Sequence, residues 1–198
     1  MDIVKYTFHG HPGILPNKVC DEIIKYGLSF KKKQGTVFGN TKHNKKLLKT
    51  RNSFVTWLNV FWIYKEILPS VKGSNAEACW NYDIVYPEQF QFTEYNGDQK
   101  QHYDWHIDGS FNSLDENNYY RKVSTVVNLS DPKDYEGGDL EFYDYLRPNA
   151  KGKFLSTKLF KKRGSIISFP SFIYHRVKPV TKGTRHSLVI WHRGPQFK

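Results

Sequence analysis

The second part of the sequence limits the possible folds most strongly, because from residue 82 onward it is a series of short segments rich in β-branched and aromatic residues. Turn-forming residues separate these segments at even spacing, among them Gly137-Gly138 and Thr181-Lys182-Gly183. Short strands at regular spacing are typical of antiparallel barrels and sandwiches. We therefore predict strands near residues 82–86, 89–95, 102–108, 121–129, 138–143, 154–160, 165–169, 175–180 and 184–192.

The first 81 residues have a different pattern, in which helical periodicity alternates with polar stretches. A serine followed three residues later by a glutamate marks a helix start at residue 74. We predict an amphipathic helix over 16–27, a mobile loop over 29–46, a strand over 51–58, a helix over 60–71 and a further helical turn over 74–80.

No internal repeat or linker divides the chain, so we expect a single domain over residues 1–198. Residues 1–81 would form a helical support with a mobile loop, and residues 82–198 the β core. Hydrophobic residues make up 38% and aromatic residues 16%, which excludes disorder as the main state. Because Cys20 and Cys79 cannot make a disulfide framework and no membrane span is apparent, we expect a soluble protein in a reducing cytoplasm, or in the host cytoplasm if viral.

The formal net charge is +11, and the charge is distributed unevenly. Residues 25–51 hold nine Lys or Arg and residues 145–198 hold thirteen, with no acidic residue in either stretch. Residues 52–144 hold sixteen acidic and six basic residues. Basic stretches attract nucleic acid and other anions, but solvated lysines on loops are an equally ordinary explanation. Charge alone leaves both interpretations open.

One segment has the composition of a metal site. In a strand, His106 and Asp108 lie on the same face, so one imidazole and one carboxylate converge. His175, at the start of a later strand, is the leading candidate for a third ligand. Two imidazoles and one carboxylate bind non-haem Fe(II) and leave coordination positions open. A His-x-Asp pair alone is weak evidence, since His102 and Asp104 form another and both pairs fit a solvated strand.

The residues that follow His175 favour the metal site. Arg185 and Ser187 lie on the next strand after a turn, where antiparallel pairing brings them back beside the proposed ligand. A guanidinium there can bind a carboxylate through two hydrogen bonds, and the serine hydroxyl adds a donor. His186 and His192 alternate with these residues, and we expect both to be surface residues rather than ligands.

With these motifs in place, the chain resembles the Fe(II)- and 2-oxoglutarate-dependent dioxygenases, specifically the prolyl 4-hydroxylase-like, PKHD-type branch with bacterial and phage members. The similar segments are residues 20–24, 91–95, 103–108, 135–140 and 164–170. The resemblance implies an α+β, mainly β fold: a double-stranded β-helix of the jelly-roll, cupin-like type, with N-terminal helices packed on one sheet.

The resemblance also implies roles for individual residues. It selects His106 over His102, so that the iron ligands are His106, Asp108 and His175, and it implies that Arg185 binds the distal carboxylate of 2-oxoglutarate. Further cosubstrate-binding candidates are Tyr95, Ser187, Asn128 and Trp191. Tyr95 and Trp191 could instead be core aromatic residues.

The implied activity is hydroxylation of an unactivated C–H bond, with Fe(II), 2-oxoglutarate and O2, and with ascorbate as a reductant. A peptidyl proline is the expected target, and the enzyme would be a monomer or homodimer.

Two alternatives remain. A nucleic-acid demethylase of the same superfamily would have Asn at position 187, where this chain has Ser. A barrel that binds polyanions without catalysis would use the basic segments. If the segment 31–49 covers the site, an acidic peptide is favoured over nucleic acid.

Overall fold

The structure is a computed structural model that describes residues 6–37, 45–109, 114–144 and 154–196. Its main elements are two antiparallel sheets, one of nine strands and one of five. None of the described helices is long and apolar enough to cross a membrane. Cys20 is buried and Cys79 is exposed, and both are free thiols.

The larger sheet is built around β14, the longest strand. Its path, in spatial order, is β1 (His9–His11), β12 (Ile166–Pro170), β8 (Tyr120–Asn128), β14 (Val180–Gly194), β6 (Phe90–Asn96), β4 (Phe54–Leu58) and β2 (Lys33–Gln34). Two short strands, β5 (Tyr86–Pro87) and β9 (Tyr135–Gly137), also pair with β14.

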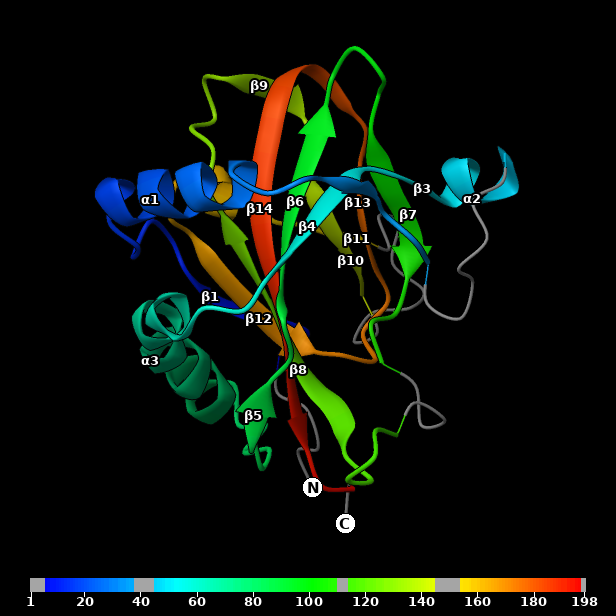
Figure 1. The fold of residues 1–198 in the computed structure, drawn as a ribbon. Coiled ribbons are helices and arrows are strands. Elements are labelled where there is room, and N and C mark those ends of the chain that lie inside the picture. The colour runs from blue at the N-terminus through cyan, green and yellow to red at the C-terminus, as the bar shows by residue number, and fades with distance from the viewer. Residues whose placement is uncertain (1–5, 38–44, 110–113, 145–153, 197–198) are drawn as a thin grey trace.

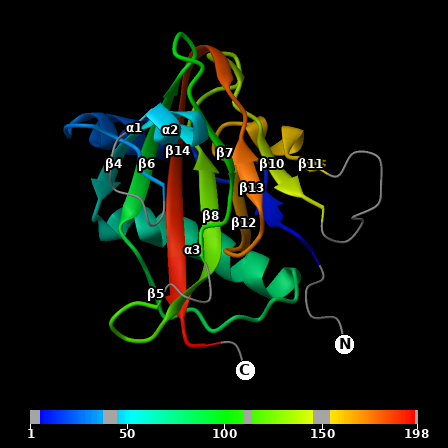
Figure 2. The ribbon, with the colours of Figure 1, turned by 90° about the vertical axis from the view of Figure 1, so that its right-hand side faces the viewer.

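The smaller sheet lies on the right of the larger one in Figure 1 and is drawn from its own side in Figure 2. Its strands, in order, are β11 (Phe154–Ser156), β10 (Leu140–Tyr143), β13 (His175–Val177), β7 (His102–His106) and β3 (Arg51–Asn52). The helices are α1 (Asn17–Leu28), α2 (Lys45–Thr50), α3 (Phe61–Glu77) and the 3-10 turn η1 (Lys158–Lys161). This is the double-stranded β-helix that the sequence predicted.

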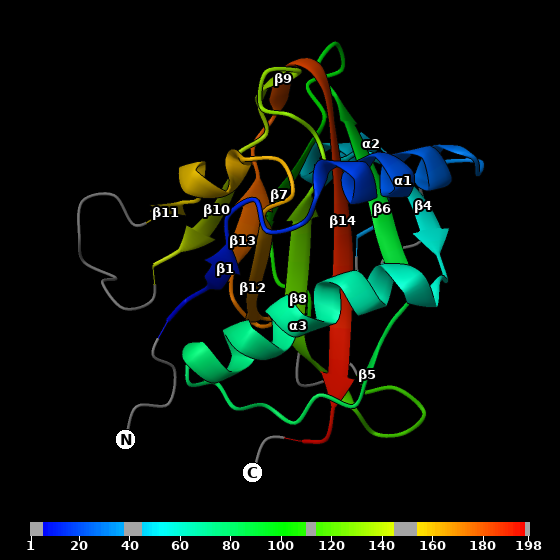
Figure 3. The same ribbon diagram turned by 90° about the vertical axis from the view of Figure 1, so that its left-hand side faces the viewer.

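The helices α1 and α3 cover one face of the larger sheet, as Figure 3 shows, and this arrangement too was predicted. One core cluster fills that contact and includes Ile23 of α1, Ile67 of α3 and Leu188 of β14. A second cluster, with Phe142 and Phe169, lies between the two sheets. Burying one such side chain contributes about 1.5–3 kcal/mol. One core therefore fixes the helices to the outer face of the larger sheet, and the other fixes its inner face to the smaller sheet.

The helix α3 differs from the prediction, because it runs without a break from Phe61 to Glu77 and no new helix starts at Ser74. Pro69 lies inside it and removes one backbone donor. Burial of Ile67 and Val71 on one face outweighs that cost. The Ser74 hydroxyl does not cap a helix but lies within hydrogen-bond distance of imidazole nitrogens of His9 and His11. Both histidines belong to β1, a strand that the sequence did not indicate.

Several strands also have other bounds than predicted. The segment 51–58 is divided between the sheets, since β3 joins the smaller and β4 the larger. Five predicted strands are cut short: 82–86 contributes only its end to β5, 102–108 ends at His106, 138–143 begins at Leu140, 154–160 ends as the turn η1, and 175–180 ends at Val177. In the predicted loop 29–46, the described part contains β2 and the start of α2, and residues 38–44 lie outside the described residues.

A cluster of three charged or titratable side chains lies on the helix-covered face of the larger sheet: Lys32, which precedes β2, Glu94 of β6 and His186 of β14. Lys32 Nζ lies 2.7 Å from Glu94 Oε1, and His186 Nε2 lies 3.4 Å from Glu94 Oε2. The hydrogen bond from His186, opposed by burial and helped by Lys32, lowers the pKa of Glu94 to about 2. A carboxylate with a lowered pKa stabilises the fold above its unfolded-state pKa of about 4.3, and this stabilisation is lost as the pH falls toward 2.

We predict that Glu94→Gln lowers the free energy of unfolding at pH 7 by about 1 kcal/mol, after allowance for solvent screening. The difference from the unmodified protein should shrink as the pH falls from 5 toward 2. Chemical denaturation across this pH range measures it. Glu66→Gln, on an exposed part of α3, is the matched control, and an equal effect of both substitutions at pH 7 would contradict the prediction.

Candidate functional site

The three residues predicted as metal ligands are brought together by the pairing of β7 with β13. His106 ends β7 and is directly opposite His175, the first residue of β13. Asp108 follows two residues after His106, just beyond the strand. One ligand atom from each residue lies within 4.8 Å of the others. The Nε2 atoms of His106 and His175 are 3.6 and 3.5 Å from the two carboxylate oxygens of Asp108.

Backbone carbonyls fix the orientation of both imidazoles. His106 Nδ1 lies 2.7 Å from the carbonyl oxygen of Asp104, and His175 Nδ1 lies 2.8 Å from that of Ile173. Each Nδ1 is therefore placed to donate to a carbonyl, and each Nε2 faces the carboxylate of Asp108, where a metal ion would bind. Burial, together with the neighbouring His106, lowers the pKa of His175 to about 4. A neutral imidazole of this kind is the form that binds a metal ion.

The carboxylate of Asp108 is buried, and its Oδ2 has no hydrogen-bond partner among the described residues. Burial raises the pKa of Asp108, but the imidazoles of His175 and His106 outweigh this effect and hold the pKa well below its usual range. An ionised buried oxygen without a donor is costly. A divalent cation would satisfy it, and two imidazoles with one carboxylate are the donor set of non-haem Fe(II). The residues fit that ion.

Aromatic rings support the cluster from both sides. Tyr103 stacks on His106 at 3.5 Å between ring centroids, and Phe169 meets the His175 ring edge-on at 4.6 Å. Burial raises the pKa of Tyr103 to about 12, so its hydroxyl stays protonated at neutral pH. The stacking holds the imidazoles in place in the absence of an ion.

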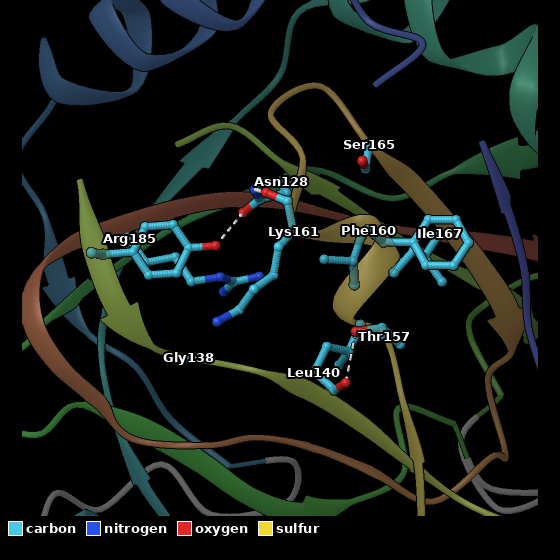
Figure 4. Close-up of a pocket in the computed structure, with 11 residues that line it drawn as sticks. Asn128, Gly138, Leu140, Thr157, Phe160, Lys161, Ser165, Ile167 and Arg185 are labelled. Carbon is cyan, nitrogen blue, oxygen red and sulfur yellow. Dashed lines mark hydrogen bonds between the residues drawn. The ribbon is translucent and has the colours of Figure 1, made fainter. Parts of the chain in front are cut away.

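Arg185 lines a small cavity of about 20 Å³ inside the barrel, shown in Figure 4. Its register partner is Tyr95, and the guanidinium lies 5.6 Å from the Tyr95 ring centroid. Arg185 Nη1 donates a long hydrogen bond of 3.4 Å to Ser187 Oγ. The close approach of Gly138, at a φ of +64°, is required here, because a Cβ at that position would lie 2.9 Å from Arg185 Cδ.

Of the other predicted cosubstrate residues, Asn128 borders the same cavity and Tyr95 lies beside Arg185. Asn128 is directly opposite Ser187 in the pairing of β8 with β14. Its amide nitrogen donates to the carbonyl oxygens of Ser130 and Lys161, at 3.0 and 2.8 Å. The side chain of Asn128 therefore fastens the cavity wall. Tyr95 is both a core aromatic, only 3% exposed, and a neighbour of Arg185, so the two interpretations of Tyr95 are compatible.

Trp191 does not line this cavity, contrary to the prediction. It lies six residues beyond Arg185 along β14, about 20 Å at the rise of a strand. It instead borders a second cavity of about 160 Å³ on the Asp108 side. Other residues that line this second cavity are Arg51, Trp57, Tyr103 and Arg121.

Two buried donors in the second cavity have no partner. Arg51 donates from Nε to Ser53 Oγ at 3.0 Å and from Nη1 to the carbonyl oxygen of Thr36 at 2.7 Å, but its Nη2 has no partner among the described residues. The indole Nε1 of Trp191 has none either. Arg51 was missed because it is one more basic residue at the end of a lysine-rich stretch. Its burial, which no pattern in the sequence signals, distinguishes it.

Arg121 was also missed, and its contacts connect the second cavity to the ligand Asp108. Its Nε and Nη2 bind the two carboxylate oxygens of Glu88, and its Nη1 donates to the carbonyl oxygen of Asp108 at 2.9 Å. The guanidinium lies 4.0 Å from the ring centroid of Trp191. Arg121 therefore holds both the metal-ligand loop and one aromatic wall.

The remaining histidines of β14 face the helices. His186 lies on the outer face, as predicted for a residue that is no ligand. His192 was expected at the surface but is fully buried beneath α3, where its ring is 5.8 Å from Tyr64. Lys32 of the predicted covering segment binds Glu94 on this same outer face, away from the second cavity.

Comparisons with known proteins agree with this geometry. The family model of the 2OG-Fe(II) oxygenase superfamily matches residues 90–193. A PKHD-type hydroxylase of Janthinobacterium sp. (strain Marseille) is 35% identical over 102 residues, which cover 50% of this chain and 41% of the relative. One from Azoarcus sp. (strain BH72) is 40% identical over 95 residues, 48% of this chain and 38% of the relative. The chain thus matches less than half the length of these relatives.

Solved structures share the fold over nearly the whole chain. A viral collagen prolyl hydroxylase from Paramecium Bursaria Chlorella virus-1, in complex with 2OG, has a TM-score of 0.68 at 20% identity and covers 96% of this chain and 97% of its own. A prolyl hydroxylase from Trichoplax adhaerens, in complex with a hypoxia inducible factor peptide fragment, has a TM-score of 0.70 at 18% identity. The match covers 94% of this chain and 83% of that protein.

The family model spans more than half of the sequence, and its matched residues include the proposed ligands and Arg185. The chain therefore belongs to the 2OG-Fe(II) oxygenase superfamily, with Fe(II) and 2-oxoglutarate as its metal and cosubstrate.

Proposed function

We propose that the protein hydroxylates a prolyl residue of a peptide in a reaction that depends on Fe(II) and 2-oxoglutarate. The observation that carries this proposal is the second cavity, which is lined by Asp108 and by Arg51 and Trp191, each with a buried donor, Nη2 and Nε1, that has no hydrogen-bond partner among the described residues. Buried donors without partners are costly, and a carbonyl oxygen of a bound peptide would satisfy them. The aromatic rings around them suit a compact apolar ring.

In this proposal His106, Asp108 and His175 hold the iron, and Arg185 with Ser187 binds the distal carboxylate of 2-oxoglutarate. When bound, the metal and cosubstrate supply the oxidising chemistry, in which 2-oxoglutarate and O2 yield succinate, CO2 and a hydroxylated C–H bond. The protein positions the reactants and excludes water. Arg121 fixes the loop that holds Asp108, and Tyr103 and Phe169 keep the imidazoles in their orientation.

The comparisons support a peptide substrate by analogy. Curated relatives are named PKHD-type hydroxylases, and solved proteins of the same fold are described as prolyl hydroxylases, one of them with a bound peptide. Ser187 departs from the pattern expected of nucleic-acid demethylases and lies against Arg185. We also propose that an acidic residue in the peptide helps binding, through Arg51 rather than Lys32, because Arg51 lines the second cavity whereas Lys32 binds Glu94 on the outer face of the larger sheet.

The direct test is to incubate the protein with Fe(II), 2-oxoglutarate and a panel of proline-containing peptides, and to follow succinate formation and peptide mass. A peptide that gains the mass of one oxygen at proline supports the proposal. Release of formaldehyde from a methylated oligonucleotide, with no gain of oxygen by any peptide, would contradict it.

Substitution of the ligands tests the metal centre. We predict that Asp108→Ala and His175→Ala reduce 2-oxoglutarate turnover by at least about a hundredfold, because either change removes a ligand of the facial triad. Arg185→Ala should mainly raise the KM for 2-oxoglutarate, by about tenfold or more, through loss of a charge-assisted contact. Succinate formation measures both effects.

The other His-x-Asp pair provides the control. Both ring nitrogens of His102 lie 3.0 Å from backbone carbonyl oxygens, so His102→Ala should leave turnover nearly unchanged. Full succinate production by the Asp108→Ala protein would show that the ligand assignment is wrong.

Substitution of the unpartnered donors tests the peptide site. We predict that Arg51→Met and Trp191→Phe each raise the KM for a peptide substrate by about tenfold, because each removes an unpartnered donor and keeps most of the apolar volume. Arg51→Met also removes the hydrogen bonds to Ser53 and Thr36. Turnover of 2-oxoglutarate without peptide should stay within about twofold of the unmodified protein. Lys65→Met, on an exposed part of α3, removes a cation elsewhere and should change neither value. An unchanged peptide KM in both variants would contradict the assignment.

A further inference from the structure

The small cavity around Arg185 contains a second cationic side chain, Lys161, which the sequence did not single out. Lys161 is the last residue of the turn η1. Figure 4 shows its side chain extending from the Asn128 side of the cavity toward the guanidinium of Arg185. Two cations from separate elements therefore face one small space.

The position of Lys161 is fixed at both ends. Its carbonyl oxygen accepts a hydrogen bond of 2.8 Å from the amide of Asn128, which ties η1 to β8. Its Nζ lies 2.7 Å from Asp139 Oδ1 and 5.6 Å from the ring centroid of Tyr135. The Lys161 side chain is 31% exposed and borders both Asp139 and the cavity.

The charges around the cavity are unbalanced. Arg185 and Lys161 are the charged residues that line it, and no carboxylate lines it. Arg185 is buried and, among the described residues, its guanidinium makes no ion pair, having only Ser187 Oγ and the Tyr95 ring close by. Asp139 compensates Lys161 from outside the lining. A buried cation without an anion is costly, so the cavity is suited to a carboxylate group.

We propose that Lys161 is a second binding residue for the distal carboxylate of 2-oxoglutarate, and that it shares this carboxylate with Arg185 while Asp139 holds Lys161 in place in the empty cavity. This inference rests on the proposed function. An arginine fork and an ammonium group approach a carboxylate in different ways, so both can bind the same group.

The alternative is that Lys161 and Asp139 form a structural ion pair that only closes the cavity wall. The two possibilities differ in what removal of Asp139 does. If Lys161 is a ligand, Asp139→Asn frees it for the cosubstrate and leaves binding equal or tighter. If the pair is structural, Asp139→Asn and Lys161→Met damage the wall in the same way.

The experiment is a calorimetric titration of the full chain, loaded with Mn(II) as a redox-inert metal. The ligands are 2-oxoglutarate and 2-oxopentanoate, which lacks the distal carboxylate. We expect Lys161→Met to weaken 2-oxoglutarate binding by about tenfold or more and to leave 2-oxopentanoate and Mn(II) binding unchanged. Lys158→Met, on the exposed side of the same turn, is the matched control and should have no effect.

The outcomes separate this inference from the function on which it rests. Unchanged 2-oxoglutarate affinity in Lys161→Met, with normal binding by the unmodified protein, would overturn the role of Lys161 alone. Equal weakening of both ligands in Lys161→Met and Asp139→Asn would establish the structural pair and overturn it as well. Failure of the unmodified protein to bind 2-oxoglutarate would overturn the proposed function together with the inference.

Discussion

The pairing of β14 with β6 on one side and β8 on the other is the constraint on which both cavities depend. It sets Arg185 beside Tyr95, and six residues further it sets Trp191 beside Ser124. Because alternate residues of a strand share a face, one strand supplies the inner walls of two separate spaces while its other residues pack under α1 and α3. A shift of register by one residue would turn Arg185 toward the helices and Leu188 into the barrel.

The cluster of metal ligands lowers the stability that the paired strands give to the fold. The barrel buries an ionised carboxylate whose Oδ2 has no donor among the described residues, and it holds two imidazoles against that carboxylate by backbone hydrogen bonds and stacking. An arrangement of this kind costs free energy without a cation and recovers it when a cation binds. Preorganisation therefore comes from the packing around the ligands, and the fold tolerates the cost because two hydrophobic cores lie on either side of the sheet.

Sequence reasoning predicted the parts of this protein that depend on local pattern. Alternation in strands indicated a barrel or sandwich and placed His106 and Asp108 together, while the family resemblance selected the full ligand set. Sequence reasoning was wrong about the antiparallel pairing expected between the strands of His175 and Arg185, because β13 pairs with β7 and β10 in the smaller sheet and β14 lies in the larger sheet. It failed where tertiary burial decided the outcome. The helix α3 continues through Pro69 because its buried face outweighs one lost hydrogen bond, His192 is buried because a long strand passes under that helix, and Arg51 is distinguished from nearby lysines only by its surroundings. None of these effects has a local signature.

The two cavities also differ in charge, and this difference bears on how a dicarboxylate would be oriented. Each cavity is lined by one cation that has no carboxylate partner among the described residues, Arg185 in the first and Arg51 in the second. Each is also lined by one cation that is ion-paired, Lys161 with Asp139 and Arg121 with Glu88, but only the second cavity is lined by a carboxylate, that of Asp108. On the proposed assignment, the distal carboxylate of 2-oxoglutarate is attracted toward Arg185 and repelled from the side where Asp108 is open to substrate. The second cavity, on the Asp108 side, is therefore better suited to an uncharged hydrogen-bond acceptor near the metal. A peptide carbonyl is such a group. Electrostatics would thus keep cosubstrate and substrate in separate cavities before any shape complementarity acts.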